Sequence, residues 1–254
     1  RRMDDILREA EGLVEKRHGS GNYALRKSKF KTVTFLVEQT GRSPNPIWYA
    51  AYEAFHMLAV AKGITVRLCI IPGDCINITK NHFDQSDLFV AALALNPERV
   101  ASISSHGIPV IWLEEYEGRL PGPSVCFDNF EAGRIAAEFL IGKGCRKLLY
   151  VTFSMSKHGS RYGDFTSDRR FEGFRRGIVE YGKGACSVQY YTCVGDFVKF
   201  TPELRPYFET RGMIDGVLAF CDNTACLVIK AAFDAGRKVP EELAVMGIDG
   251  LPWG

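Results

Sequence analysis

The feature that most constrains the fold is the alternation of apolar, strand-like runs with amphipathic segments from residue 32 onward. The strand-like runs are TVTFLV (32–37), ITVRLCII (64–71), DLFVAALAL (87–95), PVIWLEE (109–115), KLLYVTF (147–153), VQYYTC (188–193), GVLAFC (216–221) and LAVMGID (243–249). Helices are expected between them, over 46–62, about 97–106, from 129 onward, about 167–181, about 202–211 and 223–235. Repeated strand–helix units are typical of parallel sheets that helices cover on both faces, so the sequence predicts an α/β fold.

The number of these units exceeds what one modest sheet needs, so we expect a clamshell of two similar lobes, each built on a parallel sheet. The chain is expected to change lobe near 125–128 and again near 247–252. The predicted organisation is a partial winged helix (1–25), a basic linker (26–31) and a two-lobed domain (32–254). Within that domain we expect lobe one at about 32–126, lobe two at about 127–247 and a return crossover at 248–254.

Composition excludes several classes of protein. The net charge of +2 is too small to indicate a polyanionic partner by itself, and the chain has no apolar run of membrane length. The eight cysteines show no C-x-x-C spacing, which favours reduced thiols and a cytoplasmic location. The histidines lack metal-ligand spacing, and neither a G-x-S-x-G elbow nor a phosphate-binding loop is present. We therefore expect no enzyme activity, no metal and no cofactor.

The stretch Gly19-Ser20-Gly21-Asn22-Tyr23-Ala24 fits the G-x-G-x-x-A pattern of a dinucleotide-binding turn. That turn needs a buried apolar strand before it and a helix after it. Here a charged segment, EKRH, precedes the glycines, and a basic connector follows them. Glycines between two extended segments are instead typical of a tight hairpin, so the sequence predicts a hairpin after a short amphipathic helix.

A helix followed by such a hairpin has a use in DNA recognition, where the hairpin sets cations and amides against phosphates. The residues EGLVE (11–15), Arg17 and GSGNY (19–23) resemble the end of a GntR-type winged helix-turn-helix. The resemblance implies that Arg17, His18 and Gly19 contact DNA from the wing tip. It places Arg1 and Arg2 on the recognition-helix side. The alternative is that the three arginines are solvated surface charges.

In doubly wound sheets, ligands bind beyond the carboxyl ends of the strands. The residues in those positions include carboxylates and an arginine, with Trp48 just past the first loop. Carboxylates accept hydroxyl protons, guanidinium groups donate, and an indole ring covers an apolar C–H face. The mixture therefore suits a polyhydroxylated small molecule such as a sugar.

The second half of the chain carries a set of motifs: FDN (127–129) with Gly133 and Gly144, RFEGF (170–174), Asp222 with Ala225, and VP (239–240) with LAVMGID (243–249). Together they resemble the effector-binding domain of LacI/GalR-type repressors, which is similar to periplasmic sugar-binding proteins. The resemblance implies that Arg170 and Asp249 hold the effector and that Asn45 and Trp48 form a wall. It places Asp128 and Asp222 near the hinge. The sequence departs from the family at Cys221, where asparagine is common, so the identity of the effector is left open.

Each of these residues also has a purely structural interpretation. Asp128 stands at the start of a D-x-x-E capping box, and Asp222 is placed to cap the next helix. Arg170 has Asp168 and Glu172 as neighbouring partners, and Trp48 is equally suited to a core.

The two resemblances together predict a transcription regulator, a repressor, with operator DNA and a small sugar-like effector as partners. Such pairings of a GntR-like head with a LacI-like body occur among arabinose-operon repressors. A homodimer is expected, because a palindromic operator matches a two-fold symmetric protein. The alternatives are a solute-binding protein for sugar uptake and a sugar-modifying enzyme.

Overall fold

The computed structural model describes residues 14–17, 21–24, 30–40, 43–44, 46–73, 75–79, 85–93, 95–113, 120–154, 165–194 and 197–251. The hairpin predicted near the N-terminus is confirmed, because β1 (Val14–Arg17) pairs antiparallel with β2 (Gly21–Ala24) and Arg17 is opposite Gly21. Only the backbone of Arg17 is described. The other candidate DNA-binding residues and one candidate effector residue lie outside the described residues: Arg1, Arg2, His18, Gly19 and Asn45.

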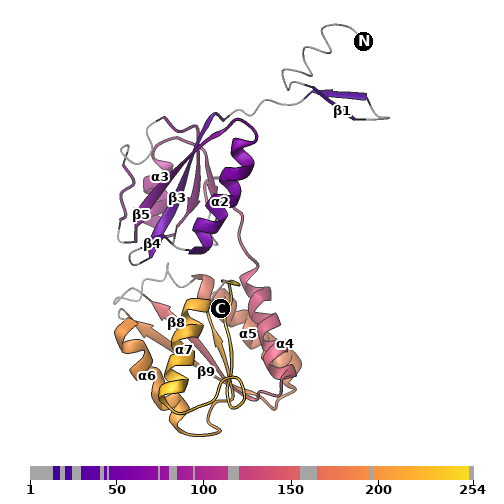
Figure 1. Cartoon of the computed structure of the whole chain (residues 1–254), viewed down its shortest axis with the longest axis vertical. Coiled ribbons are helices and arrows are strands. Elements are labelled where there is room, and N and C mark those ends of the chain that lie inside the picture. The colour runs from indigo at the N-terminus through magenta and orange to yellow at the C-terminus, as the bar shows by residue number, and fades with distance from the viewer. Residues whose placement is uncertain are drawn as a thin grey trace.

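The main body consists of two lobes, one above the other in Figure 1. The upper lobe is built on β3 (Thr32–Thr40), β5 (Thr65–Pro72), β6 (Leu88–Ala92) and β7 (Val110–Trp112), all parallel, with the short antiparallel strand β4 (Ser43–Pro44) at the end of β3. Helices α2 (Pro46–Val60) and α3 (Pro97–Ser104) cover its two faces. Every residue of β6 is buried, as a central strand covered on both faces requires.

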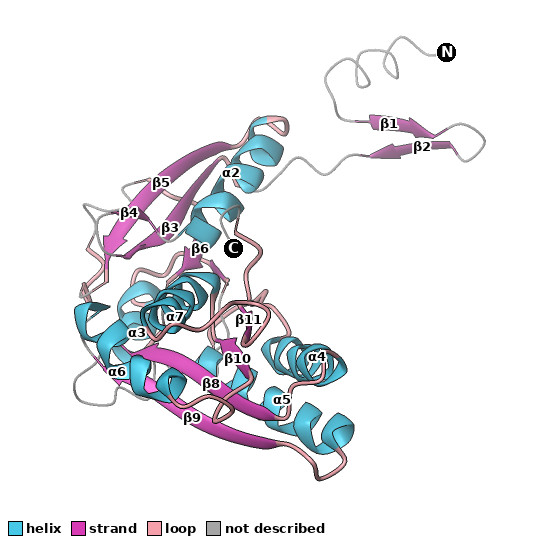
Figure 2. Cartoon of the chain, turned by 60° about the horizontal axis from the view of Figure 1, so that its bottom comes forward, coloured by secondary structure: helices cyan, strands magenta, loops and turns pink. Residues whose placement is uncertain are grey.

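The lower lobe is built on a second parallel sheet with the strand order β11-β10-β8-β9. Its strands are β8 (Lys147–Ser154), β9 (Ser187–Val194), β10 (Gly216–Ala219) and β11 (Ala244–Met246). Helices α4 (Asn129–Gly142) and α5 (Phe165–Gly182) cover one face, and α6 (Phe197–Glu209) and α7 (Asp222–Asp234) cover the other. Figure 2 shows α4 and α5 side by side at the right of the lower lobe.

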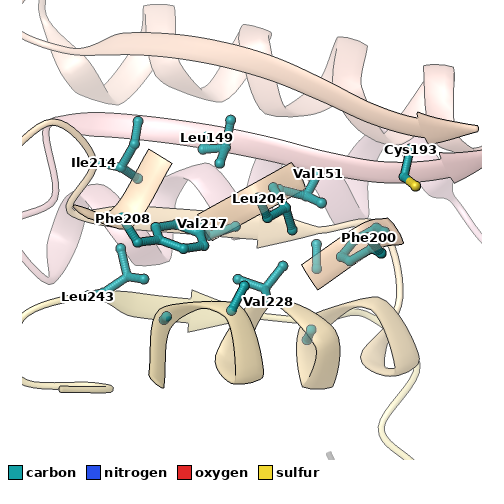
Figure 3. Packing of buried hydrophobic residues seen from close by; sticks show 14 residues of the cluster. Leu149, Val151, Cys193, Phe200, Leu204, Phe208, Ile214, Val217, Val228 and Leu243 are labelled. Atoms are coloured by element: carbon teal, nitrogen blue, oxygen red, sulfur yellow. The ribbon is translucent and has the colours of Figure 1, made fainter. Parts of the chain in front are cut away.

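Side chains of β8 alternate between the two faces, as the two-residue period of a strand requires. Leu148 and Tyr150 pack toward α4 and α5, whereas Leu149 and Val151 pack toward α6 and α7. Figure 3 shows Leu149 and Val151 above the helix that carries Val228, which is α7, together with Phe200. This double burial fixes the register of the strand, because a slip of one residue would exchange the two sets.

The predicted fold and the observed helices differ most at α6. The helix begins at Phe197, ahead of the predicted start at Pro202, and it contains both Pro202 and Pro206. Proline in a helix interior removes a backbone donor. The apolar side chains of α6 compensate for this loss, because Phe200, Leu204 and Phe208 are completely buried against the sheet. Packing therefore overrides the local proline signal.

Glycines bring α4 and α5 into backbone contact. A Cβ atom on Gly133 would lie 2.8 Å from the carbonyl carbon of Arg170, and one on Gly173 would lie 2.7 Å from the carbonyl carbon of Phe130. Both distances are shorter than real Cβ contacts allow, and each carbonyl oxygen would be closer still. The two helices can approach this closely only because both positions are glycine.

Gly173→Ala is expected to destabilise the lower lobe by at least about 2 kcal/mol, because the helices must separate or bend to admit the methyl group. Urea unfolding followed by circular dichroism measures the effect. Gly142→Ala is the matched control at the end of α4, since a Cβ there meets nothing within 4 Å. It should leave stability unchanged or raise it by up to about 1 kcal/mol. Equal effects of the two substitutions would contradict the role given to the glycine contact.

Candidate functional site

The candidate site lies at the carboxyl ends of the strands of the lower sheet. Strand β10 ends at Ala219, just before Cys221 and α7, and β11 ends at Met246, just before the loop that carries Asp249. Helix α5 contributes Arg170 near its N-terminal end. Elements that are far apart in the sequence therefore bring Arg170, Asp222 and Asp249 together, in the position where doubly wound folds bind ligands.

Arg170 is held by three described partners. Its Nε donates to Oδ1 of Asn129 at 2.9 Å, and its Nη1 donates to the Phe220 carbonyl and lies 3.8 Å from Oδ1 of Asp249. The residue is only 6% exposed, so these contacts keep the guanidinium in one orientation. Among the described residues, none accepts a hydrogen bond from Nη2. A guanidinium group has five N–H donors, more than these described contacts use.

Asp249 is the most perturbed acid of the site. The pKa of its carboxyl group is raised to about 6, mainly by burial; the Arg170 guanidinium lowers the pKa, and the Asp222 carboxylate raises it. The backbone of Asp249 has a φ of 141°, which residues other than glycine rarely adopt. Strained backbone and a shifted acid in one residue are typical of functional sites.

Asp222 supports the loop on which Asp249 stands. Its Oδ2 accepts a hydrogen bond from the Leu251 amide at 2.7 Å, and its own amide donates to the Ile248 carbonyl at 3.0 Å. The loop also packs tightly at Gly247, where a Cβ atom would lie 2.9 Å from the Asp222 Cα. Asp222 thus brackets Asp249 from both sides in the sequence and fixes its position.

An aromatic pair joins the two lobes. Trp48, at the start of α2, has its ring centroid 6.2 Å from that of Phe127, with 30° between the ring planes. Trp48 is half-buried and packs against the core of the upper lobe, so its predicted core interpretation is partly right. Phe127 lies in the segment that leads into α4 and is 60% exposed. The pair offers flat apolar surface of the kind that covers the C–H face of a sugar.

A family comparison identifies this part of the chain. Residues 137–252 match the model of the periplasmic binding protein-like domain. The match includes Arg170, Asp222 and Asp249.

Two curated relatives are transcription regulators. The chain is 29% identical over 147 residues to the ribose operon repressor of Halalkalibacterium halodurans, covering 58% of this chain and 41% of the relative. It is 26% identical over 242 residues to the HTH-type transcriptional regulator GntR of Pseudomonas aeruginosa, covering 90% of this chain and 65% of the relative. The chain thus spans less than two thirds of the length of either relative. These relatives support the LacI/GalR-type resemblance of the periplasmic binding protein-like domain.

Solved structures confirm the fold class. A periplasmic binding protein/LacI transcriptional regulator from Alkaliphilus metalliredigens, complexed with D-xylulofuranose, aligns with a TM-score of 0.65 at 22% identity, over 87% of this chain and 78% of that one. An ABC transporter periplasmic solute binding protein from Actinobacillus succinogenes with bound D-allose aligns with a TM-score of 0.67 at 18% identity, over 87% and 79%. At this level of identity the likeness shows the fold alone.

Asp128 is the N-cap of α4, at the start of the lower lobe. Its Oδ1 accepts from the Glu131 amide at 2.9 Å, which confirms the capping interpretation. The Glu131 carboxylate pairs with Arg134 at 2.7 Å. The Asp128 side chain is exposed and is committed to the cap, whereas its neighbour Asn129 is buried and contacts Arg170. Asn129 therefore positions Arg170. It is not among the site residues predicted from the sequence, although it belongs to the same FDN motif as Asp128.

The upper lobe has its own arginine at the strand ends, and sequence reasoning missed it. Arg99 is 2% exposed, and its Nη1 lies 2.6 Å from Oε1 of Glu38 at the end of β3. Its other nitrogens donate to the carbonyls of Pro72, Gly73 and Cys75 after β5. Arg99 stabilises the rim of the upper lobe that faces the lower lobe. Nothing in the sequence around Arg99 distinguishes it from a surface arginine.

The described part of the chain contains no group of three or more His, Cys, Asp or Glu side chains that could hold a metal ion. Among the helices in the described ranges, none is long and apolar enough to cross a membrane.

Asp249→Asn is expected to stabilise the periplasmic binding protein-like domain at neutral pH. Because the folded pKa of Asp249 is raised from 3.8 to about 6, the folded state binds this proton more tightly than the unfolded state. The free energy of unfolding therefore falls as pH rises from about 4 to about 6 and stays low above that. The asparagine should remove this loss and add up to about 3 kcal/mol near pH 7.5, with no gain below about pH 4.

Urea unfolding across this pH range measures the difference. Asp234→Asn is the control, since Asp234 pairs with Lys230 at 2.8 Å on the exposed side of α7. It should change stability by less than about 1 kcal/mol at every pH. A loss of stability in Asp249→Asn at neutral pH would show that attraction to Arg170 outweighs the cost of burial.

Proposed function

We propose that the chain belongs to a sequence-specific, DNA-binding transcription regulator, a repressor, whose operator affinity is controlled by a small polar effector such as a sugar. The observation that carries the proposal is the Arg170–Asp249 pair, which is buried at the strand ends with the donors of Nη2 unused by described residues. We propose a cytoplasmic location and no enzymatic activity. The relatives' names as transcription regulators support both statements.

The chemistry of the site supports a polyhydroxylated effector. Arg170 offers guanidinium donors, and the ionised Asp249 carboxylate accepts from hydroxyl groups. Trp48 and Phe127 offer an aromatic surface at the junction of the lobes. We propose Asn45 as a further part of the wall, and Asp128 and Asp222 as residues of the rim. The D-xylulofuranose and D-allose in the two similar structures are consistent with this class of ligand.

The N-terminal hairpin supports a DNA-binding head. An antiparallel pair with its turn between Arg17 and Gly21 has the form of a wing that approaches phosphates. We propose that Arg17, His18 and Gly19 contact DNA from the wing and that Arg1 and Arg2 contact it from the preceding helix.

A homodimer is the assembly we propose, with α2 at its centre. The solvent side of α2 carries an almost entirely apolar stripe at the spacing of one helix face. Its exposed positions are Tyr49, Ala50, Glu53, Ala54, Met57, Leu58 and Val60. Met57 is 72% exposed and Leu58 67% exposed. A stripe of this kind with small residues between large ones suits packing against the same helix of a second copy.

Leu58→Glu is expected to convert the dimer into a monomer, because the interface would have to bury two carboxylates. Sedimentation velocity at micromolar concentration measures the change, and circular dichroism checks the fold. Val179→Glu is the control, since Val179 is 72% exposed on α5 in the other lobe. It should leave the assembly unchanged. A wild-type protein that is monomeric at these concentrations would refute the proposed assembly.

The regulatory proposal is tested on the full-length protein, with the DNA upstream of its own gene and a panel of pentoses and hexoses. We expect salt-sensitive retardation of that DNA, and one sugar that changes it at least tenfold at a fixed protein concentration. Arg170→Ala and Asp249→Ala should still bind DNA but lose the response to the sugar, and calorimetry should show at least about tenfold weaker sugar binding.

Arg169→Ala is the matched control, because Arg169 is the neighbouring arginine and pairs with Glu172 at 2.6 Å outside the Arg170 cluster. It should respond to the sugar as the wild type does. A solute-binding protein for uptake is the alternative, favoured by the fold shared with the D-allose-binding transporter component. Sugar binding without any DNA retardation would favour that alternative, and unchanged sugar affinity in both site variants would refute the site.

A further inference from the structure

The Arg170 cluster has more negative than positive charge. The Arg170 guanidinium lies beside the Asp249 carboxylate, which has the Asp222 carboxylate as a second charged neighbour, and all three side chains are more than nine-tenths buried. The remaining described partners of Arg170 are neutral: the Asn129 amide oxygen and the Phe220 carbonyl. The Asp249 carboxylate therefore balances the charge of Arg170, and these three described side chains, when fully ionised, carry an excess of one negative charge.

This balance bears on the class of effector. A phosphate or carboxylate group that approached Nη2 of Arg170 would also approach Asp249, and burial of like charges together is unfavourable. A hydroxyl group meets no such penalty, because it donates to the carboxylate and accepts from the guanidinium. The two kinds of partner stand only 3.8 Å apart, close enough for adjacent hydroxyl groups of one polyol to reach both.

We propose that the effector is an uncharged polyol, rather than a sugar acid or sugar phosphate, and that at mildly acidic pH its binding releases one proton from Asp249. The proposal rests on the function proposed above and specifies the class of its ligand. The proton comes from the carboxyl group and goes to solvent, because only the ionised carboxylate accepts hydrogen bonds through both oxygens.

The groups that face Asp249 determine the pH at which this coupling occurs. Arg170 faces it from α5 and favours ionisation, whereas Asp222 at the start of α7 opposes it. Cys221 also lies near, and burial raises the pKa of its thiol, so it stays neutral in this range. The neighbour from α4, Asn129, carries no charge. The pKa of Asp249 of about 6 then leaves roughly one molecule in ten ionised at pH 5.

The coupling between ionisation of Asp249 and effector binding predicts the direction in which affinity changes with pH. A polyol that binds only the ionised form should bind about tenfold more weakly at pH 5 than at pH 7.5. Binding near pH 6 should release about half a proton, and binding at pH 8 almost none. A sugar acid should follow the opposite trend, because protonation of Asp249 removes the excess negative charge that repels it.

Isothermal titration calorimetry on the full chain tests these expectations. The probes are D-ribose, D-xylulose and D-allose, each with its aldonic acid or its phosphate ester where one exists. Titrations in two buffers with different heats of ionisation give the number of protons released at each pH. We expect an uncharged parent sugar to bind the protein, with the pH trend and proton release described above.

Two variants test whether the change of affinity with pH comes from Asp249 rather than from other acidic residues. Asp222→Asn keeps an acceptor for the Leu251 amide but removes the carboxylate that raises the pKa of Asp249, so the midpoint of the affinity change should move to lower pH. Asp234→Asn, on the exposed side of α7, should leave the midpoint where the wild type has it.

Tighter binding of an aldonate or a sugar phosphate than of its parent sugar at pH 7.5 would overturn the proposal and leave the regulatory function standing. So would sugar affinity that is independent of pH in the wild type. If none of the probes binds at any pH while the full-length protein still retards DNA, the proposed effector site itself fails, and the inference fails with it.

Discussion

The contact between α4 and α5 is the feature on which the candidate site depends. Gly133 on α4 meets the backbone of Arg170, and Gly173 on α5 meets the backbone of Phe130. These contacts place the backbone of Arg170 closer to α4 than packing through side chains would allow. At that distance Asn129, next to Phe130, reaches Nε of Arg170 at 2.9 Å. The orientation of the guanidinium thus follows from two positions where no side chain exists.

Rigidity around Arg170 contrasts with strain around Asp249. Its carboxyl group is buried beside a second acid, and its φ of 141° costs conformational energy. The hydrogen bonds of Asp222 to Ile248 and Leu251 hold the loop in this conformation. Glycine would adopt this backbone conformation at less cost. We propose that an aspartate stands there because its charge is needed for binding.

Much of this architecture is predictable from the sequence, and the exceptions have a common physical cause. Strand β6, helix α4 with its Asp128 cap, and the N-terminal hairpin follow from local patterns, because each depends on residues close in the chain. Asn129 and Arg170 are 41 positions apart, and Glu38 and Arg99 are 61 positions apart. No local pattern encodes such pairs. The sequence predicts the wrong start for helix α6 for the same reason. Burial of Phe200 and Leu204 against distant strands outweighs the cost of two prolines inside the helix.

The two lobes use an arginine at the strand ends in different ways. Arg99 in the upper lobe donates to Glu38 and to three carbonyl groups, which is the arrangement of a structural brace. Arg170 in the lower lobe has three described partners, and its Nη2 has none among them. An arginine with all donors satisfied gains nothing from a guest, whereas one with a donor group left over gains a charge-assisted hydrogen bond. We propose that polar recognition belongs to the lower lobe and that the upper lobe contributes Trp48 and a fixed rim. A guest bound first to Arg170 would meet that rim only as the lobes approach each other, which is how a binding event in one lobe can be converted into a change in the arrangement of both.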